Sequence, residues 1–181
     1  MKKVLIGVQV IIVAGIGVVA TVVGLAGRDR PAPDVADLAV ERDALPQEDN
    51  AYTFFVSATN VFYWPTNSTF VTDYLDGKTV DAAVVADLLD RNTQVFEIIK
   101  RGISCKKCVA PEVTGFDSLL PHLSPWRNIG RYLAARTRSC RLSGRHADAT
   151  ASCVSLLRFG DMVQRDPECL IQYLVGIAIM D

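Results

Sequence analysis

The one compact chemical motif in this sequence is a pair of cysteines, Cys105 and Cys108, separated by two lysines. A Cys-X-X-Cys pair is typical of either a redox couple or one half of a zinc site. Redox chemistry needs a thiolate, which the charges of Lys106 and Lys107 favour. A pair of the thioredoxin kind should follow a strand and begin a helix, whereas this pair follows a predicted helix and precedes Pro111. This context favours a structural role.

A zinc site would need more ligands than this pair supplies. Structural zinc takes four ligands, commonly from two close pairs. The other candidates in the sequence form no second close pair: Cys140, Cys153, Cys169, His122 and His146. We therefore predict no metal, no cofactor and no catalytic residue. A thiol-redox or metal-binding protein that uses Cys105 and Cys108 stays open as the alternative.

A disulfide between Cys140 and Cys153 is a second hypothesis. The two residues are placed symmetrically about a predicted helix turn near residue 146. Facing positions of two close helices can bring Cα atoms to the roughly 4.4–6.8 Å that a disulfide requires. The competing interpretation is that both are small apolar residues in the seam of a helical hairpin.

An arginine face forms the third candidate site, because five arginines fall within about 80° on one side of a predicted helix. They are Arg127, Arg131, Arg138, Arg141 and Arg145. Such a face is usually solvated, but it also suits the phosphate groups of anionic lipids. Arg136 points to the apolar side, where it would need a carboxylate partner or a path to water.

Charge is divided unevenly along the chain. Residues 31–99 carry twelve acidic and three basic side chains, a net charge of −9, and residues 100–165 carry twelve basic and four acidic ones, a net charge of +8. We interpret this mainly as attraction between the halves of one domain, with an anionic partner as the alternative. Aromatic residues do not alternate with the basic ones, so we predict no nucleic-acid binding.

The first element that must position these residues is an apolar N-terminal segment. Residues 4–27 contain no charge, and Gln9 and Thr21 are their only clearly polar side chains. About 20 apolar helical residues cross the hydrocarbon core of a bilayer, so residues 1–27 are predicted to form a transmembrane anchor. The alternative is a cleaved signal peptide that ends near Ala26, which would make the protein secreted. With an uncleaved anchor, we expect a cytoplasmic N-terminus and an extracytoplasmic domain.

The remainder is predicted to be mainly α, with residues 28–47 as a juxtamembrane linker and residues 48–181 as a single all-helical domain. Hydrophobic periodicity and helix-end signals predict helices over residues 47–63, 79–102, 124–142, 147–164 and 166–180, with a loop over 103–123. Short connections predict antiparallel helical hairpins. The chain stops inside an apolar helix, so we expect the natural protein to continue past Asp181.

Two resemblances support a helical fold. The segment from Leu142 to Ala149, with helices on both sides, resembles the turn of one tetratricopeptide-type hairpin. The anchor, the LPQEDNAY helix opening at residues 45–52 and the hairpins rich in alanine and arginine are similar to uncharacterised membrane-anchored proteins of planctomycete-type bacteria. These resemblances imply an all-α protein of the bacterial envelope and no particular activity.

The leading functional hypothesis from the sequence is a membrane-tethered, non-enzymatic helical domain that interacts with a protein partner or acts as a scaffold. Its contact with the lipid bilayer would run through residues 4–27. The alternatives are the thiol-redox or metal-binding protein and a domain whose arginine face docks on anionic lipid.

Overall fold

The structure is a computed structural model that describes residues 45–111, 120–165, 167 and 169–181. All of these belong to one unit of the chain, Ala44–Asp181. The predicted anchor and residues 28–44 of the predicted linker lie outside the described residues. Within the described part, no helix is both long enough and apolar enough to cross a membrane.

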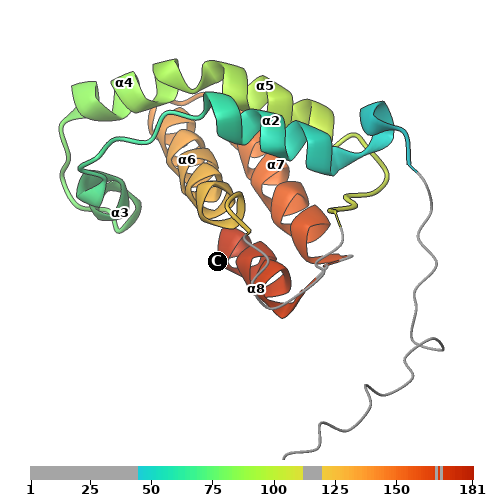
Figure 1. The fold of residues 1–181 in the computed structure, drawn as a ribbon. Helices are drawn as coiled ribbons and strands as arrows, with labels where there is room; N and C mark the ends of the chain where they lie inside the picture. The colour runs from blue at the N-terminus through green and yellow to red at the C-terminus, as the bar shows by residue number, and fades with distance from the viewer. Residues whose placement is uncertain (1–44, 112–119, 166, 168) are drawn as a thin grey trace, which may run out of the picture. The chain divides into compact units, whose positions relative to one another are not determined.

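The described residues form a mainly helical domain, as the sequence predicts, and the extended structure in them is limited to one isolated bridge between Asn50 and Lys107. The elements are η2 (Gln47–Asp49), α2 (Ala51–Val61), α3 (Thr69–Leu75), α4 (Ala82–Arg91), α5 (Thr93–Gly102), α6 (Leu123–Leu142), α7 (His146–Arg165) and α8 (Leu170–Met180). In Figure 1, α4 and α5 follow one another above α6 and α7, α2 lies beside α5, and α8 packs against α6 and α7.

The break between α4 and α5 differs from the single helix predicted over residues 79–102. Asn92 stands at the break, and its side chain is fully buried. Its Oδ1 accepts a hydrogen bond from the Tyr63 backbone N–H at 2.8 Å, and its Nδ2 donates to Tyr63 O and Leu88 O at 2.8 and 2.9 Å. The Tyr132 hydroxyl donates to Asn92 O at 2.9 Å. Asn92 therefore joins the end of α4 to the segment after α2 and to α6.

The α6–α7 hairpin confirms the predicted turn. Gly144 has φ +72°, a left-handed conformation that suits glycine at the end of a helix. The Arg145 N–H returns to Cys140 O at 2.9 Å, which satisfies a carbonyl in the last turn of α6. The helices begin and end within one residue of the predicted limits.

Helix α8 packs unusually close to α7 because two glycines meet. A Cβ atom built on Gly176 would stand 2.7 Å from the Gln164 Cβ and 2.9 Å from the Gly160 carbonyl oxygen. A Cβ atom built on Gly160 would also stand 2.9 Å from the Gly176 carbonyl oxygen. These separations are shorter than real Cβ contacts, so the two positions require glycine.

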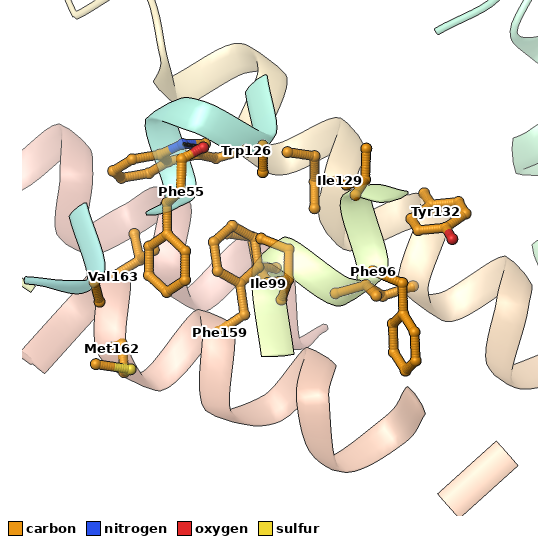
Figure 2. Packing of buried hydrophobic residues seen from close by; sticks show 14 of the residues in the cluster. Phe55, Phe96, Ile99, Trp126, Ile129, Tyr132, Phe159, Met162 and Val163 are labelled. Atoms are coloured by element: carbon orange, nitrogen blue, oxygen red, sulfur yellow. Dashed lines mark hydrogen bonds between the residues drawn. The ribbon is translucent and has the colours of Figure 1, made fainter. Parts of the chain in front are cut away.

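The core is assembled from α2, α5, α6 and α7 around aromatic side chains (Figure 2). Trp126 and Phe159 are fully buried, and both make edge-on ring contacts with Phe55 at centroid separations of 5.9 and 4.7 Å. The Trp126 indole N–H donates to Phe55 O at 3.2 Å. The ring contacts and the hydrogen bond fix the orientation of α2 on the α6–α7 hairpin.

Candidate functional site

The Cys105 and Cys108 motif lies just after α5, at the carboxyl end of that helix. The Cys105 N–H donates to Gly102 O at 3.0 Å, which continues the last turn. The Cys105 thiol contacts Glu48 O at 3.8 Å and Arg101 O at 3.7 Å, both of which accept its weak S–H donor. Cys108 is 2% exposed. The carboxyl end of a helix carries negative partial charge, so this position does not favour a thiolate.

The electrostatics of Cys105 agree with that placement. Burial raises the pKa of the Cys105 thiol, and the nearby negative charge of Asp49 raises this pKa further. Among the described residues, no three His, Cys, Asp or Glu side chains lie close enough together to hold a metal ion. The position and electrostatics of Cys105 thus do not favour the thiolate that a redox couple needs.

We predict that Cys105 reacts slowly with alkylating reagents at neutral pH. Because the thiolate is the nucleophile, a raised pKa lowers its fraction at every pH below that pKa. The alkylation rate should rise about tenfold from pH 7 to pH 8. Pulse labelling with iodoacetamide and quantification of the Cys105 peptide by mass spectrometry measures this, with glutathione in the same tube as the reference. A rate that is already constant at pH 7 would support a redox thiolate instead.

The segment that contains the cysteine motif is hydrogen-bonded to the start of α2. The Ala51 N–H donates to Lys107 O at 2.9 Å. The Asn50 side chain donates to Val109 O at 2.8 Å, accepts from the Val109 N–H at 2.9 Å and also accepts from the Tyr52 N–H at 3.1 Å. Asn50 therefore caps α2 and holds the segment after α5 against it.

Cys140, which is buried, and Cys153, which is half-buried, are both free thiols in the structure. The disulfide predicted between those two is not formed. The Ser152 hydroxyl donates to Leu133 O at 3.1 Å, which places Leu133 opposite the turn of α7 that contains Cys153. Cys140 lies seven positions further along α6, or about 10 Å at the helical rise. The residues that face each other across the hairpin are therefore shifted from the predicted pairing, in which Cys140 faces Cys153.

The two histidines occupy different environments. His122 is buried, and its ring packs against Trp126 and Tyr52 at centroid separations of 4.4 and 5.3 Å. Burial lowers the pKa of His122. His146 is exposed at the start of α7. These contacts make His122 a packing residue at the start of α6.

The predicted arginine face lies on α6 and the turn after it, but its members are not equivalent. Arg127, Arg141 and Arg145 are exposed, whereas Arg131 and Arg138 are half-buried. Arg145 pairs with Asp148 at 3.4 Å. The Arg138 guanidinium carbon lies 5.2 Å from the centre of the Tyr74 ring. We call these five residues the arginine strip. Among them, Arg138 makes the cation–π contact with Tyr74 that joins α6 to α3.

Arg136 has a partner that its sequence position did not indicate. Its guanidinium carbon lies 4.1 Å from the centre of the Phe96 ring, and its Nε is buried without a hydrogen-bond partner. The face of an aromatic ring attracts a cation, so the Phe96 ring takes the place of the carboxylate partner that the sequence analysis expected for Arg136. The side chain therefore joins α6 to α5.

The ion pairs between residues that the structure describes are local. Lys78 pairs with Asp73 and Asp76, and the remaining pairs also join residues within five positions of each other: Arg91 with Asp87, Lys100 with Glu97, Arg145 with Asp148 and Arg165 with Asp161. Exposed pairs of this kind contribute little to stability, because water and salt screen the charges. Among these pairs, Lys100 with Glu97 joins the basic segment to the acidic one, but only across the boundary between them, so the attraction between the halves stays a prediction.

The outer face of α8 is an apolar surface that the sequence analysis did not single out. The exposed fractions are 71% for Leu170, 61% for Ile171, 53% for Leu174 and 41% for Tyr173. Residues 170–180 contain no charged side chain. A helix at the surface of a soluble domain normally carries a polar stripe on its outer side. The lack of charged side chains in this segment could have predicted the exposed apolar face. We call these four residues the α8 face.

The α8 face and the arginine strip are two surfaces of the described domain that could contact a protein or a membrane. Contiguous exposed apolar side chains are typical of sites that contact a protein or a membrane. Comparisons of the chain with protein-family models, with curated proteins and with solved structures found no match.

Proposed function

We propose that this protein is a non-catalytic helical domain tethered to a membrane, and that the α8 face docks on the bilayer surface. The observation that carries the proposal is the exposure of Leu170, Ile171 and Leu174 on a helix without charged side chains. Moving one leucine or isoleucine side chain fully out of water contributes roughly 1.5–3 kcal/mol. Three such side chains inserted at the level of the headgroups would hold the domain flat against lipid.

The N-terminal sequence supports the bilayer as the occupant of the α8 face. The uncharged segment at residues 4–27 has the length and composition of a membrane span. The 17 residues at 28–44 can extend to at most about 60 Å, so they would keep the domain within that distance of the membrane. A tether of this length gives a second, weak contact a high effective concentration.

The arginine strip supports the same occupant through charge. Gly130 marks the side of α6 that touches α8, because a Cβ atom built on it would lie 3.1 Å from Ile179. Arg127 and Arg131 lie about 60° and 100° around α6 from Gly130. Positive side chains therefore border the helix that carries the α8 face. Apolar side chains next to arginines suit the boundary of a bilayer with anionic headgroups.

Photo-crosslinking tests which molecule covers the α8 face. The full chain is reconstituted into liposomes that contain anionic lipid, with Ile171→p-benzoylphenylalanine as the probe. Illumination is expected to attach lipid to residue 171, because the side chain would lie among the acyl chains. Mass spectrometry of the peptide that contains this residue measures the adduct. The same illumination in native membranes shows whether another protein is captured instead.

The control is Val84→p-benzoylphenylalanine, because Val84 is also an exposed apolar side chain, 42% against 61% for Ile171, but lies on α4, at the end of the domain opposite α8 in Figure 1. We expect little lipid adduct at residue 84. Equal adducts at both positions would mean unspecific contact and would contradict the proposal. A crosslink from residue 171 to a second copy, or to another protein without lipid, would replace the bilayer with that partner.

A further inference from the structure

A cavity separate from the α8 face lies between the α3–α4 connection and the end of α6. Its volume is about 370 Å³. The polar part of its wall comes from Tyr74, Lys78, Thr79, Arg138, Ser139 and Ser143. Four of these side chains carry hydroxyl groups and two carry positive charge. The lining of the cavity therefore includes six side chains that can donate hydrogen bonds.

Arg138 is the residue in this cavity whose contacts are incomplete. It is half-buried, its Nε is buried without a hydrogen-bond partner, and its guanidinium group packs on the Tyr74 ring. Among the described residues, no ion pair to Arg138 is formed. A half-buried guanidinium normally has an anionic partner, because its desolvation is otherwise not offset. The guanidinium group, which no described acid neutralises, therefore has the charge to bind an anion from outside the domain.

Lys78 differs from Arg138 in this respect. Its Nζ lies 2.6 Å from an Asp73 oxygen and 3.9 Å from an Asp76 oxygen. Those acids compensate the lysine, so Arg138 supplies the positive charge that is not balanced at the cavity. Lys78 still has ammonium hydrogens available beyond the bond to Asp73.

Apolar side chains also line the cavity, among them Val80, Val85, Ala86 and Leu142. A ligand that contacts both kinds of side chain would carry a charged group and a small apolar body. Arginine binds carboxylates and phosphates in a bidentate way, but one such pair satisfies a carboxylate. The added hydroxyl donors of Ser139, Ser143 and Thr79 match the larger number of acceptor oxygens on a phosphate.

We propose that this cavity binds a phosphomonoester with a small apolar body, its phosphate held by Arg138 and the neighbouring hydroxyl groups. The apolar body would lie against Val80, Val85 and Leu142. The phosphate can belong to a soluble ester or to the headgroup of a lipid such as phosphatidic acid. The chemistry that the cavity recognises is the same in both cases.

Calorimetric titration of the full chain in a non-ionic detergent tests the site, with phenyl phosphate and dihexanoyl phosphatidic acid as probes. We expect saturable binding of at least one of them. Arg138→Gln should weaken that binding at least about tenfold, since a hydrogen bond to a charged group is lost. Binding of both probes assigns a soluble ester as an acceptable ligand, and binding of the phosphatidic acid alone assigns the lipid source.

Two further variants make the result specific. Arg141→Gln removes the same charge three positions away without touching the cavity wall, and it should change the affinity less than about twofold. Ala86→Phe keeps every cation but fills the cavity, so it should abolish binding while the thermal unfolding midpoint stays near that of the wild type. The proposal is overturned if neither probe binds saturably, or if Arg138→Gln and Arg141→Gln weaken binding equally.

Discussion

Replacing Trp126 by alanine is expected to lower the free energy of unfolding by about 3–5 kcal/mol, the range for removing a large buried aromatic side chain. Trp126 is fully buried and lies in ring contact with Phe55, Tyr52 and His122. Its loss leaves a cavity where α2 meets the α6–α7 hairpin. Urea denaturation of the full chain in a non-ionic detergent, followed by circular dichroism, measures the change.

Two variants separate the volume of Trp126 from its hydrogen bond. Trp126→Phe keeps most of the ring volume but loses the donation to Phe55 O, so it should cost only about 1–2 kcal/mol. Trp64→Ala is the matched control, because the second tryptophan is half-buried and stacks on Phe62 alone among the described rings. A loss at Trp64 as large as that at Trp126 would contradict the assignment of the core to α2, α6 and α7.

Replacing Asn92 by alanine is expected to destabilise the domain by about 2–4 kcal/mol, because a fully buried amide and its hydrogen bonds to two other segments are lost. The Tyr63 N–H and C=O both depend on the Asn92 amide, and so does one contact to Leu88 O. The same denaturation experiment measures the loss. The segment after α2 should also become more accessible, which hydrogen exchange of the Tyr63 amide reports directly.

The conservative variant Asn92→Asp distinguishes hydrogen bonding from packing at this site. Aspartate has the same shape, but its second oxygen would face Tyr63 O and Leu88 O without a hydrogen to donate. Asn92→Asp should therefore be at least as destabilising as Asn92→Ala. Asn60→Ala, at an exposed position of α2, should stay within about 0.5 kcal/mol of the wild type. An Asn92→Asp protein of wild-type stability would show that the amide donor contributes nothing.

The elements that the sequence predicts well are those whose ends depend on local backbone chemistry. Gly144 ends α6 within one residue of the expected position, since a left-handed residue is needed there and glycine takes it readily. Helix α3 was missed because its seven residues, TFVTDYL, contain two β-branched threonines and a valine and have no clear helical period. Its contact with α6 stabilises it in the folded domain.

The candidate sites were less predictable because their partners lie far away in the sequence. Asparagine is common on helix surfaces, yet the Asn92 side chain forms hydrogen bonds with the backbone of Tyr63, 29 positions earlier. Arg136 lies over Phe96, which is 40 positions away. Arg138 lines a cavity that residues from the start of α4 also line. No periodicity or local motif records such pairings, so the sequence singled out Arg136 and Arg138 without their partners and did not single out Asn92.

By itself, the sequence determined that the chain has an uncharged N-terminal segment, that the domain is mainly helical, and where the α6–α7 turn lies. These features follow from local composition and from interactions within a few positions. The tertiary structure decided the register of the hairpin, the break at Asn92, the exposure of the α8 face and the cavity at Arg138. These features arise where side chains from distant segments pack together, because burial and hydrogen bonding there depend on the fold as a whole.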